Sequence, residues 1–298
     1  MGKTAFIFPG QGAQVCGMGQ DFYENSETAK AVFDRATELL GFSVPELCFE
    51  KNDRLDITEY TQAAMVTTSV AMMKVMEERG IHADVAAGLS LGEYCALVAA
   101  GVMTADDAIR TVRERGILMQ EAVPAGVGGM SAVLGMTADE INAVVDEIPN
   151  VQVANYNCPG QLVIAGEKAA LAEAIENCKA AGARRALPLA VSGAFHTPLM
   201  AKAAAELRAY VADFTFSAPK MDIYSNLDGK VYDCSDLPAH LEQHMISPVR
   251  WTQLVKNGMA AGLTSACEIG PGKTLTGFAG KISKELTCKT VQDMAGVE

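Results

Sequence analysis

The chain has 298 residues, of which 49% are hydrophobic and 20% are charged, and its formal net charge is −12. That length is enough for one large core, or for one core with a small inserted domain, and the composition is typical of soluble globular proteins. The negative charge argues against nucleic-acid binding, and no apolar run is long enough to cross a membrane. The start of the chain lacks the layout of a signal peptide, and its eight cysteines are scattered without a C-x-x-C pair. We therefore expect a cytoplasmic protein with reduced thiols, and with neither a disulfide framework nor a zinc site.

The first predicted strand, 4–8, stops at a loop that carries two glycines, Gly10 and Gly12. Loops at the carboxyl ends of strands are where α/β sheets place their ligands. The loop is not a dinucleotide-binding fingerprint, because Val15 stands where the third glycine of G-x-G-x-x-G belongs. It is either a simple turn or a loop in which the backbone N–H of Gln11 points at a site.

Two helices are predicted next, over 27–40 and 59–79. The second carries a row of methionines on one face, which we interpret as part of the core rather than as a binding groove. The residues on that face are Met65, Ser69, Met72, Met73 and Met76.

Residues 84–101, DVAAGLSLGEYCALVAAG, have the sequence form of a nucleophile elbow, which is G-x-S-x-G between a strand and a helix. Gly88 and Gly92 lack a Cβ, so the strand, the turn and the helix can approach one another closely. Ser90 is then exposed at the apex, and the free N–H groups at the start of the helix can stabilise a developing negative charge. The alternative is an ordinary serine in a glycine-bracketed turn.

A third helix is predicted to begin at Thr104, which forms a capping-box-like start with Asp107. At 100° per residue, Arg115 lies on the same narrow stripe as Ala108 and Val112. An arginine on an apolar stripe faces inward and needs an anionic partner. That partner is either a protein carboxylate in a structural ion pair or a substrate carboxylate.

Residues 127–191 follow a strand–helix–strand–strand–helix–strand order, which is that of the ferredoxin-like unit. We predict a ferredoxin-like small domain over 126–191, inserted into a larger domain formed by 1–125 and 192–298. His196 comes directly after it, at a strand-to-helix junction, and matches the Ser…His chain order of α/β-hydrolase-type folds.

Two further patterns lack a residue that the motif they resemble requires. The turn at 270–274 looks like a P-loop, but position 267 is Cys instead of Gly. His240 and His244 stand four residues apart on a predicted helix, yet the glutamate that a zincin requires between them is Leu241. We therefore predict no metal site.

Taken together, these motifs resemble the malonyl-CoA:acyl-carrier-protein transacylase family of bacterial fatty-acid synthesis. The resemblance covers essentially the whole chain and rests on the set of motifs in this order. They are FPGQG at 8–12, GLSLGEY at 88–94, Arg115 followed by MQEA at 119–122, NCPGQ at 157–161, GAFH at 193–196, SPVRW at 247–251 and EIGPGKTLTGF at 268–278.

The resemblance implies an α/β fold, with an α/β-hydrolase-like large domain, a ferredoxin-like insertion and the active site between them. It implies transfer of malonyl from coenzyme A to the nucleophile and then to the phosphopantetheine thiol of acyl carrier protein. The coenzyme A thioester is then a substrate, and no cofactor is implied. We expect a monomer that binds malonyl-CoA and acyl carrier protein but neither nucleic acid nor membranes.

By the same resemblance, Ser90 is the nucleophile and His196 is the general base and acid. Gln11 and Leu91 would supply the N–H groups of the oxyanion hole, and Arg115 would hold the malonyl carboxylate. Met119 and Phe195 are assigned to the substrate site. No aspartate between Ser90 and His196 suits a third triad position, so we predict a Ser–His dyad.

The chain departs from the family pattern at two positions. Leu89 replaces the histidine that usually precedes the nucleophile, which lowers the local polarity. His244 replaces a glutamine, four residues before the proline of the SPV motif, whose carbonyl is thought to orient the catalytic histidine. If a backbone carbonyl orients His196, this change is harmless; if a side chain does so, the dyad is built differently.

Three other functions remain open at this point. The first is a malonyl acyltransferase that serves a polyketide synthase in trans. The second is a serine thioesterase or other hydrolase with the same elbow, against which the inward Arg115 and the inserted domain argue. The third is a non-catalytic binding subunit, which the Ser90–His196 pair disfavours.

Carrier proteins of this kind are acidic, so docking requires a local basic rim. The candidates for this rim are Arg184, Arg185, Lys273, Lys281 and Lys284. The alternative is that these five residues are scattered solvated charges.

Overall fold

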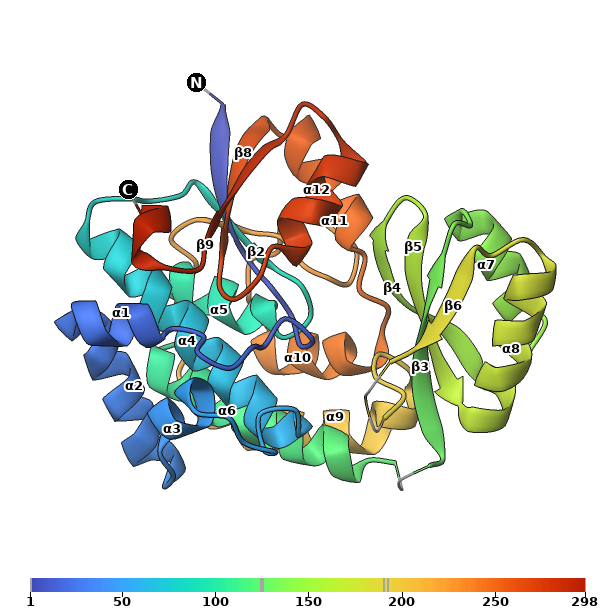
Figure 1. Ribbon diagram of the computed structural model, residues 1–298, viewed down its shortest axis with the longest axis horizontal. Helices are drawn as coiled ribbons and strands as arrows, with labels where there is room; N and C mark the ends of the chain where they lie inside the picture. Colours follow the sequence, from blue (N-terminus) through green and yellow to red (C-terminus); the bar gives the residue numbers. More distant parts are fainter. Residues whose placement is uncertain (1, 124–125, 190, 192, 298) are drawn as a thin grey trace.

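The computed structural model describes residues 2–123, 126–189, 191 and 193–297, and it contains two separate sheets (Figure 1). The first is parallel, in the order β7-β2-β1-β8-β9, and the second is antiparallel, in the order β4-β5-β3-β6. The parallel strands are β1 Lys3–Phe8, β2 Val85–Gly88, β7 Asp222–Ile223, β8 Leu263–Ile269 and β9 Thr287–Val291. The antiparallel strands are β3 Gly128–Leu134, β4 Val151–Cys158, β5 Gln161–Glu167 and β6 Arg185–Pro188. The fold is therefore mixed α/β, as predicted at that level.

Helices cover both faces of the parallel sheet. Successive side chains of a strand point to opposite faces, so a strand with apolar residues throughout needs packing partners on both sides. Phe6 and Phe8 of β1 pack into one core and Ala5 and Ile7 into another. Before the antiparallel sheet come α1 Gln20–Asn25, α2 Glu27–Leu40, α3 Val44–Phe49, α4 Thr58–Glu78, α5 Gly92–Ala99 and α6 Ala105–Glu121. After it come η1 Pro198–Met200, α9 Ala201–Val211, α10 Leu237–Ile246, α11 Trp251–Ala260, α12 Thr274–Ile282 and η2 Met294–Val297. None of the helices in the described ranges is both long and apolar enough to cross a bilayer.

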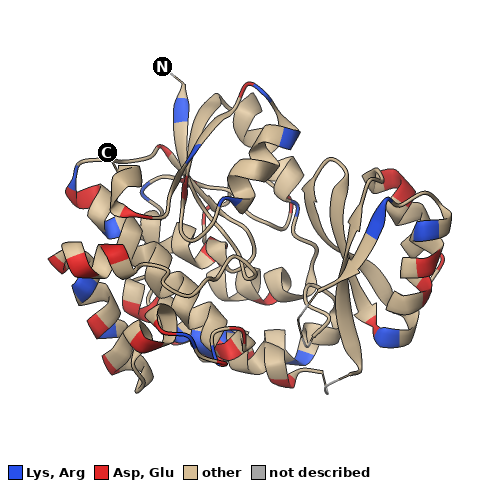
Figure 2. Ribbon diagram, in the orientation of Figure 1, with Lys and Arg blue, Asp and Glu red and all other residues tan. Residues whose placement is uncertain are grey.

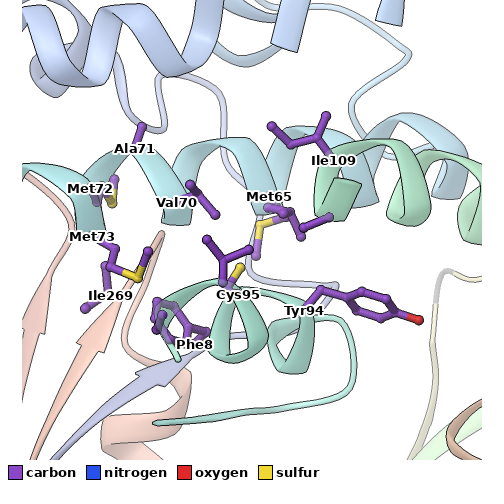
Figure 3. Close-up of a cluster of buried hydrophobic side chains, with 14 of the residues drawn as sticks. Phe8, Met65, Val70, Ala71, Met72, Met73, Tyr94, Cys95, Ile109 and Ile269 are labelled. Carbon is purple, nitrogen blue, oxygen red and sulfur yellow. The ribbon is translucent and has the colours of Figure 1, made fainter. Parts of the chain in front are cut away.

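Helix α4 runs through the larger core, and its methionine row is buried as predicted. Met65, Met72 and Met73 belong to one buried cluster with Phe8 of β1 and Ile269 of β8 (Figure 3). The burial is wider than the predicted single face, because α2, α5 and α6 all pack against α4. Polar side chains of α4, among them Gln62, are therefore buried as well.

The antiparallel sheet carries α7 Ala138–Val145 and α8 Lys168–Ala180 (Figure 1). Thr137 caps α7 in a capping box with Glu140. The last strand predicted for the small domain corresponds to RRALPLA at 184–190; β6 covers four of these residues, and the last of the seven lies outside the described residues. Two of the predicted domain-boundary residues, 125 and 192, also lie outside them. Backbone hydrogen bonds from Tyr156 to Val249 and from Val249 to Ala154, each 2.8 Å, tie β4 to the segment before α11.

Candidate active site

Ser90 stands at a tight turn between β2 and α5, in the arrangement that G-x-S-x-G predicts. A Cβ on Gly88 would lie 1.9 Å from the carbonyl carbon of Gly92, and one on Gly92 would lie 2.1 Å from the carbonyl oxygen of Phe8. Only glycine permits this approach at either position. The φ of Ser90 is 51°, in the left-handed region, which residues other than glycine rarely adopt.

His196 lies against Ser90, with 2.7 Å between its Nε2 and the Ser90 Oγ. Its Nδ1 donates a hydrogen bond to the backbone carbonyl of His244 at 3.0 Å, so Nε2 is free to accept the serine proton. The Gln152 amide donates to the backbone carbonyl of His196 at 2.9 Å and fixes this residue, whose φ is 60°. Burial, and next the positive charge of Arg115, lower the pKa of His196 to about 4, so the imidazole is neutral at pH 7.

His244 contributes to this contact through its backbone alone. Its imidazole is fully buried, and neither ring nitrogen has a hydrogen-bond partner among the described residues. Burial lowers the pKa of His244 well below its usual value, so the ring is neutral. The sequence left open whether a backbone carbonyl or a side chain orients His196, and in the structure it is the backbone carbonyl of His244.

Arg115 projects from α6 to the same point and has an exposed fraction of 1%. Its Nη1 donates to the Gln62 side-chain carbonyl at 2.8 Å and its Nη2 to the Ser90 Oγ at 3.3 Å. Among the described residues, its Nε has no hydrogen-bond partner and no carboxylate lies within salt-bridge distance. Within the described residues, therefore, Arg115 does not form the structural ion pair with a protein carboxylate that the sequence left open. A buried cation held only by neutral groups is suited to an anionic ligand.

A cavity of about 300 Å³ opens beside Ser90, between the loop after β1, the start of α12 and the antiparallel sheet. Gln11, Met119 and Phe195, which the sequence placed in the site, all line it. Leu91 is buried and is not among the lining residues. Within the described residues, neither its backbone N–H nor that of Gln11 donates a hydrogen bond. The other lining residues include Gly10, Gly12, Leu89, Ser90, Arg115, Met130, Asn155, Asn157, Gln161, Thr274, Phe278 and His196.

Three polar residues at the site escaped the sequence reasoning. Gln62 holds Arg115, and Asn226 accepts a hydrogen bond from the Ser90 backbone N–H at 2.7 Å. Glu93 accepts one from the Asn226 backbone N–H at 3.0 Å. Only Glu93 left a sequence signal, since it is a lone carboxylate in the otherwise apolar helix that follows the elbow. His240 and His244 share a face of α10, as predicted, and the described residues contain no cluster that could hold a metal ion.

Two of the candidate basic residues lie beside the cavity. Lys273 immediately precedes α12, next to the lining residue Thr274, and Lys281 donates to the side chain of the lining residue Gln161 at 3.2 Å. Basic residues lie on α12 and at the start of β6, and acidic residues lie on α1 and α2 (Figure 2). A local basic rim on an acidic protein is compatible with an acidic partner.

Known proteins share this architecture over the whole chain. A family model described as "Acyl transferase domain" matches residues 5–295. The malonyl CoA-acyl carrier protein transacylase of Bacillus subtilis is 42% identical over 304 residues, with 100% of this chain and 96% of that protein covered. The solved structure of an acyl carrier protein S-malonyltransferase from Vibrio cholerae has a TM-score of 0.95 at 42% identity, with 99% and 98% of the two chains covered. A type II PKS acyl-carrier protein in complex with its malonyl-transacylase gives a TM-score of 0.96 at 39% identity, with 99% and 97% covered.

Proposed function

Because the chain belongs to the family of malonyl CoA-acyl carrier protein transacylases, we propose that it moves malonyl from malonyl-CoA to an acyl carrier protein thiol through a malonyl ester on Ser90. One observation carries this proposal. The Ser90 Oγ lies within reach of both a neutral imidazole, at 2.7 Å, and an unneutralised buried guanidinium, at 3.3 Å. A nucleophile, a base and a carboxylate-binding cation thus meet at one end of the cavity.

In the first half-reaction, His196 Nε2 takes the Ser90 proton while Oγ attacks the thioester carbonyl. The backbone N–H groups of Gln11 and Leu91 would stabilise the negative charge on the tetrahedral oxygen. The C–S bond then breaks, His196 gives its proton to the departing thiolate of coenzyme A, and the malonyl ester remains. In the second half-reaction the carrier thiol gives its proton to His196 and attacks the ester, and His196 returns that proton to Ser90.

The malonyl carboxylate would pair with Arg115, while Met119 and Phe195 form the apolar wall beside the acyl group. The coenzyme A thioester is the substrate, and the proposed chemistry needs no cofactor. We also propose an α/β-hydrolase-like large domain formed by 1–125 and 192–298, with a ferredoxin-like insertion over 126–191. The order β4-β5-β3-β6, with α7 and α8 packed on that sheet, supports this division.

The proposal is tested by the intact mass of the protein after mixing with malonyl-CoA. We expect a single malonyl adduct that persists in water and disappears when a phosphopantetheinylated acyl carrier protein is added, with the malonyl mass appearing on the carrier. Steady release of free malonate, with no adduct and no transfer, would show a thioesterase instead. Parallel assays with fatty-acid and polyketide carrier proteins distinguish the two possible acceptors by their rates.

The acid limb of the acylation rate should report the lowered pKa of His196. Since the imidazole must be neutral to accept the serine proton, kcat/KM for malonyl-CoA should stay level from pH 7 to 5 and fall to half near pH 4. A histidine with its ordinary pKa would place the midpoint near 6.5 instead.

Folding must be monitored in this experiment, because the same shift destabilises the protein in acid. Between about pH 6.5 and pH 4 the unfolded chain binds a proton at His196 that the folded chain does not. The free energy of unfolding therefore decreases as the pH falls through this range. Brief pH jumps, with circular dichroism as the control, separate the two effects. A midpoint near 6.5 in folded protein would contradict the buried, Arg115-facing imidazole.

A further inference from the structure

Glu93 is a buried carboxylate that the proposed chemistry does not use. It lies in the first turn of α5, directly behind the Ser90 turn, and its exposed fraction is 0%. No lysine or arginine of the described residues pairs with it. A carboxylate in such a place is costly unless hydrogen bonds compensate for the lost water. Its two oxygens are in fact bonded to two different parts of the site.

The first set of contacts leads to the nucleophile. Glu93 Oε2 accepts a hydrogen bond from the backbone N–H of Asn226 at 3.0 Å. The Asn226 side chain accepts from the Ser90 N–H and donates to the Gly88 carbonyl, both at 2.7 Å. These bonds hold both sides of the turn in which Ser90 adopts its left-handed conformation. Such strained backbone persists only where the surroundings fix it.

The second set leads to the base. Glu93 Oε1 accepts from His240 Nε2 at 2.5 Å and from the Tyr232 hydroxyl at 3.3 Å. The rings of His240 and Tyr232 stack, with 4.1 Å between their centroids. His240 lies one turn before His244 on α10, and the His244 carbonyl is the acceptor for His196 Nδ1. Glu93 therefore anchors the helix that orients the base.

The carboxylate is charged while it makes these bonds. Burial alone would raise the pKa of Glu93, but the hydrogen bonds from His240 and the Asn226 backbone N–H favour the ionised form and hold the pKa below its usual value. Hydrogen bonds to an ionised acceptor are shorter and stronger than neutral ones. Replacing the charge with a neutral amide of the same shape should therefore loosen both sets of contacts.

We propose that Glu93 is a positioning residue that ties the Ser90 turn to the helix orienting His196, and so holds the reacting pair in register. The inference rests on the proposed function, since the pair must react for its register to matter. It assigns Asn226 and His240 as the two connecting residues. A shift of either partner by a fraction of an ångström would lengthen the 2.7 Å contact between Oγ and Nε2, on which proton transfer depends.

The test is single-turnover acylation of the full chain by malonyl-CoA. Glu93→Gln should lower the acylation rate constant about 30-fold, as loss of charge-assisted bonds suggests, with the half-saturating malonyl-CoA concentration within twofold of the parent. A merely structural role would reduce the fraction of active protein and leave the rate constant of the folded fraction unchanged. The matched control is Glu59→Gln, which removes a carboxylate paired with Arg113 at 2.6 Å and should leave the rate constant unchanged.

Double substitutions test the two connections. If Glu93 acts through Asn226 and His240, adding Asn226→Ala or His240→Gln to Glu93→Gln should slow acylation no more than threefold further. This inference alone would be overturned if the rate reductions of the single substitutions multiplied in the double variants, or if Glu93→Gln acylated at the parent rate. A parent protein that gains no malonyl would overturn the proposed function as well. If Glu93→Gln does not fold, Asn226→Ala and His240→Gln must each slow acylation about tenfold at unchanged half-saturation, and parent rates in both would overturn the inference.

Discussion

Ser90→Ala should gain no malonyl mass from malonyl-CoA under conditions in which the parent protein is fully labelled. Its Oγ is the only hydroxyl oxygen that contacts both His196 and Arg115 within the described residues. Removing it leaves the imidazole and the guanidinium in place but deletes the atom that forms the ester. Intact-mass measurement after a long incubation, with a peptide map of the parent, checks both the loss and the position.

The thiols of the chain offer the alternative nucleophile that this experiment must exclude. Cys95 lies on α5 close to the Ser90 turn, but it is buried, and burial raises the pKa of its thiol, so little thiolate exists at neutral pH. Ser217→Ala, which removes an exposed hydroxyl elsewhere, is the matched control and should be labelled like the parent. A labelled Ser90→Ala protein, or a malonyl group mapped to Cys95, would remove Ser90 from the mechanism.

The parts of the fold that the sequence predicts well are those set by local patterns. Helix α2 occupies the predicted residues 27–40, because its ends are marked by the Ser26 cap and by Gly41 in the left-handed conformation. The turn at Ser90 is equally local, since the space between β2, α5 and the end of β1 admits only glycine at positions 88 and 92. The phase of α6 likewise predicts the burial of Arg115.

What the sequence could not give is which residues face these groups across the fold. Gln62 and Asn226 are far in sequence from the Arg115 side chain and the Ser90 backbone N–H that they hold, and an amide carries no periodic signal. His244 drew attention as a departure from the family pattern, yet what the structure brings to His196 is its carbonyl, a group that every residue has. Glu93 could have been noticed as a charge in an apolar helix, but its two sets of partners depend on how α10 and the segment around Asn226 pack against α5.

Arg115→Ala should lower kcat/KM for malonyl transfer by roughly two to four orders of magnitude, because a desolvated charge-to-charge contact with the substrate is lost. Acetyl transfer should fall much less, or rise. With acetyl-CoA the parent must leave a buried guanidinium without an anion, at a cost on the order of 3 kcal/mol, and the variant has no such cation. The measurement is kcat/KM for malonyl-CoA and acetyl-CoA in both proteins, together with the melting temperature.

The matched control is Arg113→Ala, two residues away on the same helix. Arg113 pairs with Glu59 at 2.6 Å and packs over the ring of Tyr60, so its loss should lower the melting temperature without changing the ratio of malonyl to acetyl transfer. Arg115 should behave in the opposite way, since no carboxylate of the described residues pairs with it and it is held by Gln62 and Ser90. Its removal relieves a buried charge, so the melting temperature should hold while the substrate preference changes. If both activities instead fall together with a lower melting temperature, Arg115 stabilises the fold and the malonyl carboxylate must be bound elsewhere in the cavity.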